Sequence, residues 1–192
     1  AGPKPLKRNC AGKRPMKHSG SSTVTIRNLR RDDCAVISQA FALQGWNKPT
    51  EQYLRYEQEM LEGRRDVLIA ECGGEFAGYV TIVWGSDYPP FHEAGIPEIV
   101  DFNVLIKFRR QGIGTALMDE AERRIFRRSP IAGIGVGLTP DYGAAQVLYA
   151  RRGYVPDGRG AISHGQYITY GSTITVDDDL TICLTKKLDI PA

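Results

Sequence analysis

Two glycines that follow a basic stretch carry the clearest chemical signal in the chain. An apolar run precedes the segment Arg109–Gly114, and a run with helical periodicity follows it. Glycines between a strand and a helix let backbone N–H groups turn toward an anion, and the helix N-terminus adds positive potential. A pyrophosphate suits such a turn. The spacing differs from that of a P-loop, and Leu117 stands where a dinucleotide fingerprint has its third glycine. A plain strand-to-helix turn remains the alternative.

These residues resemble the acyl-CoA-binding motif of the GNAT superfamily of N-acetyltransferases, Gln/Arg-x-x-Gly-x-Gly/Ala. Arg109, Gly112 and Gly114 occupy its three fixed positions. The resemblance implies acetyl-CoA as cosubstrate and no metal. It places the cosubstrate against the end of one strand and the following turn, at Val104, Leu105, Ile106, Arg109, Arg110, Gln111, Gly112, Ile113, Gly114 and Thr115.

A second stretch downstream resembles the last main helix of many GNAT enzymes, Asn-x-x-Ala-x-x-Leu-Tyr-x-x-x-Gly-Phe/Tyr. The matching residues are Ala145, Leu148, Tyr149, Gly153 and Tyr154. Tyr142 stands where the family usually has Asn, which puts any CoA contact of that Asn in doubt. Two motifs in the expected order indicate the fold more specifically than one.

The resemblance also implies catalytic roles. Tyr149 is expected to protonate the departing CoA thiolate, because a phenol and a thiolate have comparable basicity. Glu98, in a Pro-Glu-Ile context, is expected to take the proton of the amine, and Asp101 is the reserve candidate. A backbone N–H around Val104–Leu105 would hold the oxyanion. The alternatives are a packed helix tyrosine and solvated edge carboxylates.

The elements that must position these residues follow from periodicity and from turn residues. Strands are predicted at 23–30, 67–72, 76–84, 98–106, 134–138, 166–176 and 180–188, and helices at 32–43, 50–63, 113–128 and 144–152. Residues 85–97 are predicted to be a loop. This order predicts an α/β fold, and the resemblance implies a GNAT-type mixed, splayed central β-sheet flanked by helices over residues 23–190.

Composition narrows the class of protein. The 192 residues carry a net charge of +3, yet residues 1–22 hold six Lys and Arg and no acid, so the remainder is mildly acidic. Residues 1–22 are predicted to be a disordered basic tail, either of artificial origin or a dispensable extension. No apolar run is long enough to cross a bilayer. The four cysteines lack metal-binding spacing, and reduced thiols in a cytoplasmic protein are expected.

Three functions remain open from the sequence. The first is an N-acetyltransferase that transfers the acetyl group to a primary amine of a small molecule, by direct attack in a ternary complex. The second is a protein acetyltransferase acting on Lys or an N-terminus, and the third is a non-catalytic acyl-CoA sensor. We expect no nucleic-acid partner for the folded domain and no membrane partner, and a homodimer is left open.

Overall fold

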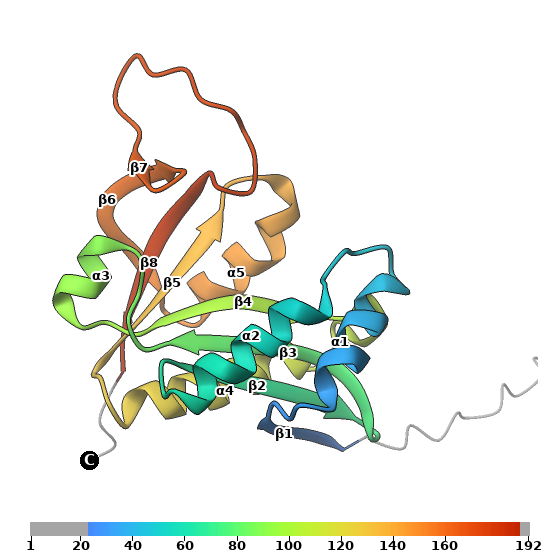
Figure 1. The fold of residues 1–192 in the computed structure, drawn as a ribbon. Helices are drawn as coiled ribbons and strands as arrows, with labels where there is room; N and C mark the ends of the chain where they lie inside the picture. The colour runs from blue at the N-terminus through green and yellow to red at the C-terminus, as the bar shows by residue number, and fades with distance from the viewer. Residues whose placement is uncertain (1–22, 189–192) are drawn as a thin grey trace, which may run out of the picture.

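The computed structural model describes residues 23–188, and the predicted tail lies outside them. Eight strands form one sheet in the order β1-β2-β3-β4-β5-β8-β6-β7 (Figure 1). The strands are β1 (Val24–Asn28), β2 (Arg65–Cys72), β3 (Glu75–Val83), β4 (Glu98–Val104), β5 (Ile131–Gly137), β6 (Val155–Ser163), β7 (Gln166–Tyr167) and β8 (Thr181–Lys187). Neighbouring strands pair antiparallel except β4 and β5, which are parallel.

Helices cover both faces of the sheet. They are α1 (Asp33–Ala42), α2 (Thr50–Leu61), α3 (Pro89–Ala94), α4 (Ile113–Phe126) and α5 (Gly143–Arg151), with two short 3₁₀ turns, η1 (Ile106–Phe108) and η2 (Pro140–Tyr142). One core cluster joins the sheet to α1 and α2, and a larger one joins the other face to α4 and α5. Burial of these apolar faces on opposite sides of β2, β3 and β4 stabilises the fold.

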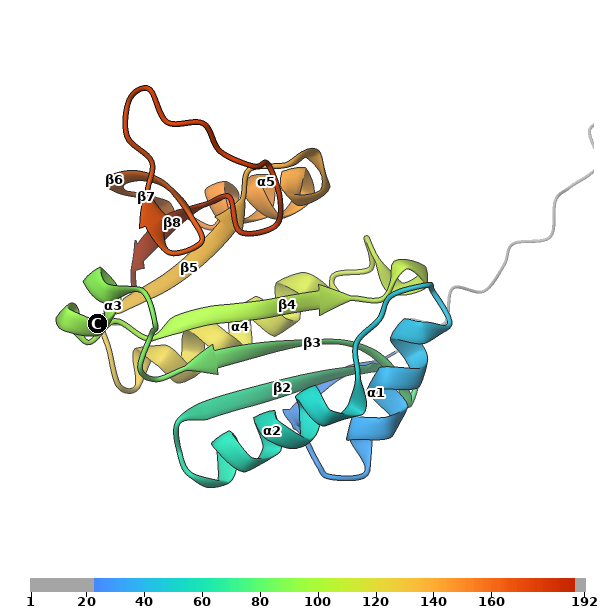
Figure 2. The ribbon, with the colours of Figure 1, turned by 45° about the horizontal axis from the view of Figure 1, so that its top comes forward.

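The sheet divides at its centre. β4 and β5 pair only at Glu98–Gly133 and Ile99–Ile134, and beyond these residues the two strands diverge (Figure 2). The divergence begins at a β-bulge in β4, where the register against β3 shifts between Tyr79 and Thr81 and Asp101 has a φ of +49°. A bulge bends its strand and increases the local twist. The splayed mixed sheet expected from the sequence is therefore confirmed.

Two predicted elements differ from the structure. Residues 85–97 are not only a loop, because they contain α3; with prolines at its first two positions this six-residue helix lacks a clear periodic signal. Residues 166–176 are not a strand beyond Tyr167. The paired strand is instead β6, whose sequence Val-Pro-Asp-Gly-Arg-Gly-Ala-Ile-Ser has few apolar residues and a proline, so the usual alternation is missing.

The remaining predicted strands and helices are present with boundaries shifted by a few residues. Within residues 23–188 no helix is both long and apolar enough to cross a membrane.

Candidate active site

The turn predicted to bind pyrophosphate lies between β4 and α4, on the edge of the divergence. Gly112 is the residue before α4 and has a φ of +83°, a left-handed conformation that costs glycine little. A Cβ built there would meet no atom within 4 Å, so Gly112 faces open space. The N–H groups of Ile113, Gly114 and Thr115 have no partner within the helix, because they lie in its first turn. This geometry fits an anion.

Gly114 has a different role. A Cβ on this residue would lie 3.1 Å from Cζ of Phe102 and 3.9 Å from Cγ2 of Val104, both on β4. The glycine therefore allows α4 to pack closely against the strand, and its contact with an anion would be made by backbone alone. The two motif glycines serve separate purposes, one for the conformation of the turn and one for packing.

At the end of β4, the backbone N–H of one residue faces the gap between β4 and β5. The Leu105 N–H donates to the carbonyl of Ala77 on β3, at 2.9 Å, so the N–H of Val104 points to the opposite edge. The Ile106 N–H donates to Oε1 of Gln44 at 3.0 Å. Val104 is thus the member of the expected Val104–Leu105 pair whose N–H faces the gap between β4 and β5.

Arg109 extends from the turn back along β4. Its Nε donates to the carbonyl oxygen of Val104 at 3.2 Å, and its guanidinium lies 5.5 Å from the ring of Trp46, in the segment between α1 and α2. Arg110 has a φ of +61° and is exposed, as is Gln111. Arg110 is therefore exposed at the turn itself, while the guanidinium of Arg109 lies toward β4 and Trp46.

Glu98 begins β4 at the point where the sheet divides. Its Oε2 accepts a hydrogen bond from Oγ of Ser86 at 2.5 Å. Its Oε1 lies on the β5 side, 3.7 Å from where a Cβ of Gly135 would be. Burial raises the pKa of Glu98, the Ser86 hydrogen bond opposes that rise, and the charge of Asp87 adds to it. One oxygen of this carboxylate is held, and the other faces the divergence beside a residue with no side chain.

Asp101 faces α2 and accepts five hydrogen bonds. Its Oδ1 is 2.9 Å from Nζ of Lys48, an ion pair. The donors come from the α1–α2 segment, α2, β3 and β4 and are Lys48, Gln52, Tyr56, Tyr79 and Asn103, at 2.7–3.0 Å. Burial first, and the charge of Asp101 second, raise the pKa of Tyr56 to about 12. Both oxygens of Asp101 are occupied by donors.

Tyr149 lies in α5, on the face of the sheet opposite Glu98, and only 5% of it is exposed. Among residues 23–188 its hydroxyl has no hydrogen-bond partner, and burial raises its pKa. Its ring centroid is 6.1 Å from that of Tyr154. The ring of Tyr142 covers Gly137, where a Cβ would clash at 2.4 Å. Tyr142 therefore has a packing role at the position where the motif described above has Asn.

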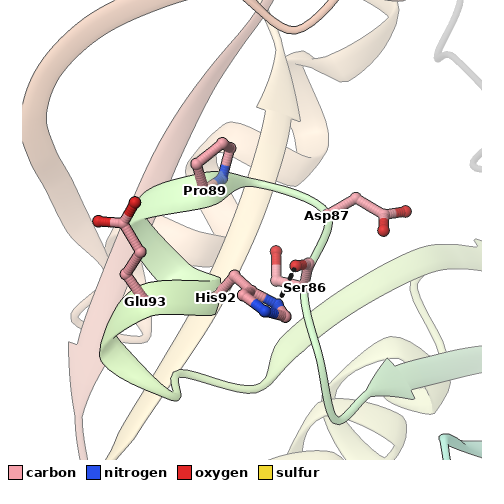
Figure 3. A pocket seen from close by; sticks show the side chains of 5 residues that line it. All are labelled: Ser86, Asp87, Pro89, His92 and Glu93. Carbon is pink, nitrogen blue, oxygen red and sulfur yellow. Dashed lines mark hydrogen bonds between the residues drawn. The ribbon is translucent and has the colours of Figure 1, made fainter.

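The segment between β3 and β4, residues 84–97, is here called the strap, and its hydrogen bond to Glu98 was not predicted from the sequence. It crosses β5, since the ring of Phe91 occupies the space where Gly133 would carry a Cβ. A pocket of about 280 Å³ lies on the strap, lined by Ser86, Asp87, Pro89, His92 and Glu93 (Figure 3). His92 Nδ1 lies 3.2 Å from the Ser86 carbonyl oxygen. No sequence pattern marks Ser86 as a site residue. Only its contact with Glu98 in the structure identifies it.

Two other groups lie near these elements. Cys183 on β8 is opposite Gly135, and burial, with Glu98 and Asp157 adding, raises the pKa of its thiol to about 12, which is unsuitable for a thiolate nucleophile. His164 lies between Asp177 and Asp179, at 3.1 and 3.0 Å, and joins the turn between β6 and β7 to the loop before β8.

Comparisons with known proteins agree with this geometry. The sequence profile of the acetyltransferase (GNAT) family matches residues 26–154. No curated protein matches the chain. Among solved structures, the putative acetyltransferase yncA of Salmonella typhimurium with its cofactor acetyl-CoA is similar at a TM-score of 0.62, with 21% identity over 88% of this chain and 96% of that one.

Two further structures show the same fold. An N-acetyltransferase from Staphylococcus aureus Mu50 is similar at a TM-score of 0.65, with 13% identity over 88% of this chain and all of that one (100%). The ribosomal-protein-S18-alanine N-acetyltransferase of Escherichia coli is similar at 0.63, with 16% identity over 88% and 97%. At these identities the likeness concerns the fold, and the acceptors of these proteins differ or are not named.

Proposed function

Since the chain belongs to the acetyltransferase (GNAT) family, we propose that it transfers an acetyl group from acetyl-CoA to a primary amine of a small molecule, by direct attack in a ternary complex. The observation that carries this proposal is the position of the Glu98 carboxylate at the start of β4, where β4 and β5 begin to separate. This carboxylate has one oxygen bound to Ser86 and the other directed toward Gly135. We assign the small acceptor to the side of Glu98 where the strap, with its pocket, lies.

The residues fit the cosubstrate. Gly112 leaves open space at the N-terminus of α4, and Arg109 and Arg110 supply positive charge beside it. We assign the pyrophosphate to this turn and the acyl arm to the edge of β4 at Val104. The thioester itself supplies the activated acyl group, and every other part of the reaction is assigned to side chains and backbone of this chain.

The proposed chemistry moves one proton on each side of the sheet. Glu98 accepts the proton of the attacking amine at Oε1, the oxygen that Ser86 does not hold. The Val104 N–H donates to the oxyanion that develops on the acyl carbonyl. The Tyr149 hydroxyl, which has no partner among residues 23–188, donates its proton to the leaving thiolate. Its raised pKa keeps the phenol protonated until the thiolate forms.

The test is release of CoA thiol from acetyl-CoA over a panel of small amines and of peptides with free N-termini or lysines. The proposal predicts turnover with small amines and at most weak turnover with peptides. Preferred turnover of peptides would assign a protein acceptor instead. A protein that binds CoA and releases no thiol with any acceptor would be a sensor, and the proposed function would be rejected.

Cosubstrate binding is tested separately by the rise in melting temperature that CoA produces, because a ligand of the folded state stabilises it by mass action. Gly112→Asn tolerates a left-handed backbone and fills the space above the turn, so it should abolish most of the rise. Gly63→Asn is the matched control, since Gly63 has a φ of +72° and also faces open space, at the end of α2. An unchanged CoA effect in folded Gly112→Asn would contradict the assignment.

A further inference from the structure

Ser86 is almost completely buried, with 2% of its surface exposed, yet it lies in the strap rather than in a strand or helix. Its hydroxyl has two partners in the structure. The N–H of Tyr88 donates to Oγ at 3.0 Å, and Oγ is 2.5 Å from Oε2 of Glu98. An N–H can only donate and an ionised carboxylate can only accept, so the single proton of Ser86 is directed to Glu98.

The strap that carries Ser86 is fixed at a second point, on the far half of the sheet. The Tyr88 hydroxyl donates to Oδ2 of Asp157 at 2.8 Å and lies 3.2 Å from the hydroxyl of Tyr167. Asp157 belongs to β6 and Tyr167 to β7. The Tyr88 ring also packs edge-on against Phe91, at 4.9 Å between centroids, and Phe91 covers Gly133 of β5. Ser86 therefore has its position fixed from both sides of the divergence.

From this geometry we propose that Ser86 is a positioning residue for Glu98: its hydrogen bond to Oε2 holds the carboxylate so that Oε1 faces the amine. The inference rests on the proposed function, in which Glu98 is the base. It assigns the orientation of that base to a residue outside both sequence motifs. On the β5 side Gly135 contributes no side chain that could hold Oε1.

The hydrogen bond also affects the ionisation of Glu98. The groups that face this carboxyl are Asp87 and Ser86 from the strap and Cys183 from β8, while β5 contributes glycine. Among these groups Ser86 alone stabilises the charged form, and burial and Asp87 both oppose it. Removing the Ser86 hydroxyl should therefore raise the pKa of Glu98 further and leave less of the base ionised near neutral pH.

The experiment measures kcat/KM for the amine against pH, together with the titration of the Glu98 carboxyl by ¹³C NMR, assigned by its loss in Glu98→Gln. Ser86→Ala should move both the acid limb of the rate profile and the NMR titration upward by about one pH unit. Near neutral pH this shift, with the lost orientation, lowers kcat/KM by roughly tenfold, and activity recovers in part at alkaline pH. Ser86→Thr, which keeps the hydroxyl, should restore both readouts.

Ser129→Ala is the matched control. Ser129 is another buried serine whose Oγ bonds its own segment, donating to the Ile131 carbonyl at 2.8 Å and accepting from the Ile131 N–H at 3.2 Å. Its loss should lower the melting temperature as much as Ser86→Ala does and leave the pH profile unchanged. If Ser86→Ala does not fold, the comparison of Ser86→Thr with Ser86→Cys, a weak donor, replaces it.

The outcomes separate the two claims. An NMR titration of Glu98 that is the same in Ser86→Ala and the parent overturns the positioning role, whatever the rates do. A second outcome is that the NMR titration of Glu98 shifts as expected in Ser86→Ala, but Glu98→Gln leaves the rate profile unchanged. This outcome overturns the proposed role of Glu98 as base, while the hydrogen bond from Ser86 stands. Parallel shifts of titration and rate support both.

Discussion

Glu98 and Asp101 lie on the same strand, three residues apart, and their carboxylates have opposite surroundings. Glu98 has one neutral donor, Ser86, and faces the divergence of the sheet. Asp101 lies under α2 with five donors, one of them the ammonium of Lys48. A carboxylate with little stabilisation of its charge has a raised affinity for a proton. The donors around Asp101 instead hold both of its oxygens in place.

The difference indicates that the two carboxylates of β4 have separate roles, one in stability and one in the proposed chemistry. Asp101 stabilises the bulge and ties it to α2, at a residue with a left-handed backbone that costs free energy to hold. Under the proposed function, Glu98 is the carboxylate of the two that remains for chemistry. Titratable groups whose charge is poorly compensated are often found at functional sites.

The largest expected effect is on catalysis by Glu98→Gln. Turnover at neutral pH should fall by roughly 10²- to 10⁴-fold, because the amine loses its base, and should recover partly at alkaline pH where the amine is already deprotonated. In the parent, the rate should decline as the pH falls through the raised pKa of Glu98. The measurement is kcat/KM against pH.

The same variant should be at least as stable as the parent at neutral pH. The pKa of Glu98 is higher in the folded protein than in the unfolded chain, so its ionised form costs stability once the pH exceeds that value, and Gln removes the cost. Thermal unfolding checks this. If Glu98→Gln were strongly destabilised and had normal turnover, Glu98 would be the stabilising carboxylate and not the base.

The next largest effect is on stability, in Asp101→Asn. An amide of the same shape cannot accept from all five donors and leaves the Lys48 charge unpaired, so the free energy of unfolding should fall by about 2–4 kcal/mol. The turnover of the molecules that remain folded should change less than tenfold. Urea denaturation and kcat on one preparation give both values. If stability is unchanged and the acid limb of the rate profile disappears, Asp101 is the base.

A smaller loss is expected from Lys48→Met, which removes the ammonium from Asp101 and from the rings of Phe41 and Tyr79. Four neutral donors remain on Asp101, and the loss should be about 1–2 kcal/mol in urea denaturation. Lys107→Met is the control, because Lys107 pairs with Glu75 at the exposed surface and should contribute under about 0.5 kcal/mol. Equal effects of the two substitutions would argue against a stabilising network at Asp101.

The smallest effect concerns Asp87→Asn. The charge of Asp87 raises the pKa of Glu98, so its removal should lower that pKa and move the acid limb of the rate profile down, by less than about one pH unit. Added salt should reduce the difference, because Asp87 is exposed. Glu93→Gln is the control from the same pocket. An upward shift in Asp87→Asn would contradict the proposed electrostatics of Glu98.

The parts of the molecule that depend on local sequence were predictable. Gly112 marks the strand-to-helix turn through its left-handed conformation, and Tyr149 lies in a helix that ends two residues before Gly153, whose φ is +85°. The mixed, divergent sheet followed from the order of elements and from the two motifs.

The parts that depend on tertiary contacts were not predictable. Glu98 and Asp101 were both candidates for the base, because the sequence does not tell which partners a carboxylate meets. The donors to Asp101 come from four separate segments, and Ser86 reaches Glu98 only because the strap folds back over β5. β6 was missed because its pairing with β8 relies on backbone hydrogen bonds and not on an alternating apolar face.

The divergence of β4 and β5 has a consequence for solubility. It gives two strands in the middle of the sheet a free edge, and free edges promote pairing with other chains and aggregation. Both edges are irregular, since β4 carries the bulge at Asp101 and β5 alternates glycines at 133, 135 and 137. Bulges and glycines make a strand a poor template for a flat, regular partner. The irregularities that accompany the opening of the sheet therefore also protect the protein against association through that opening.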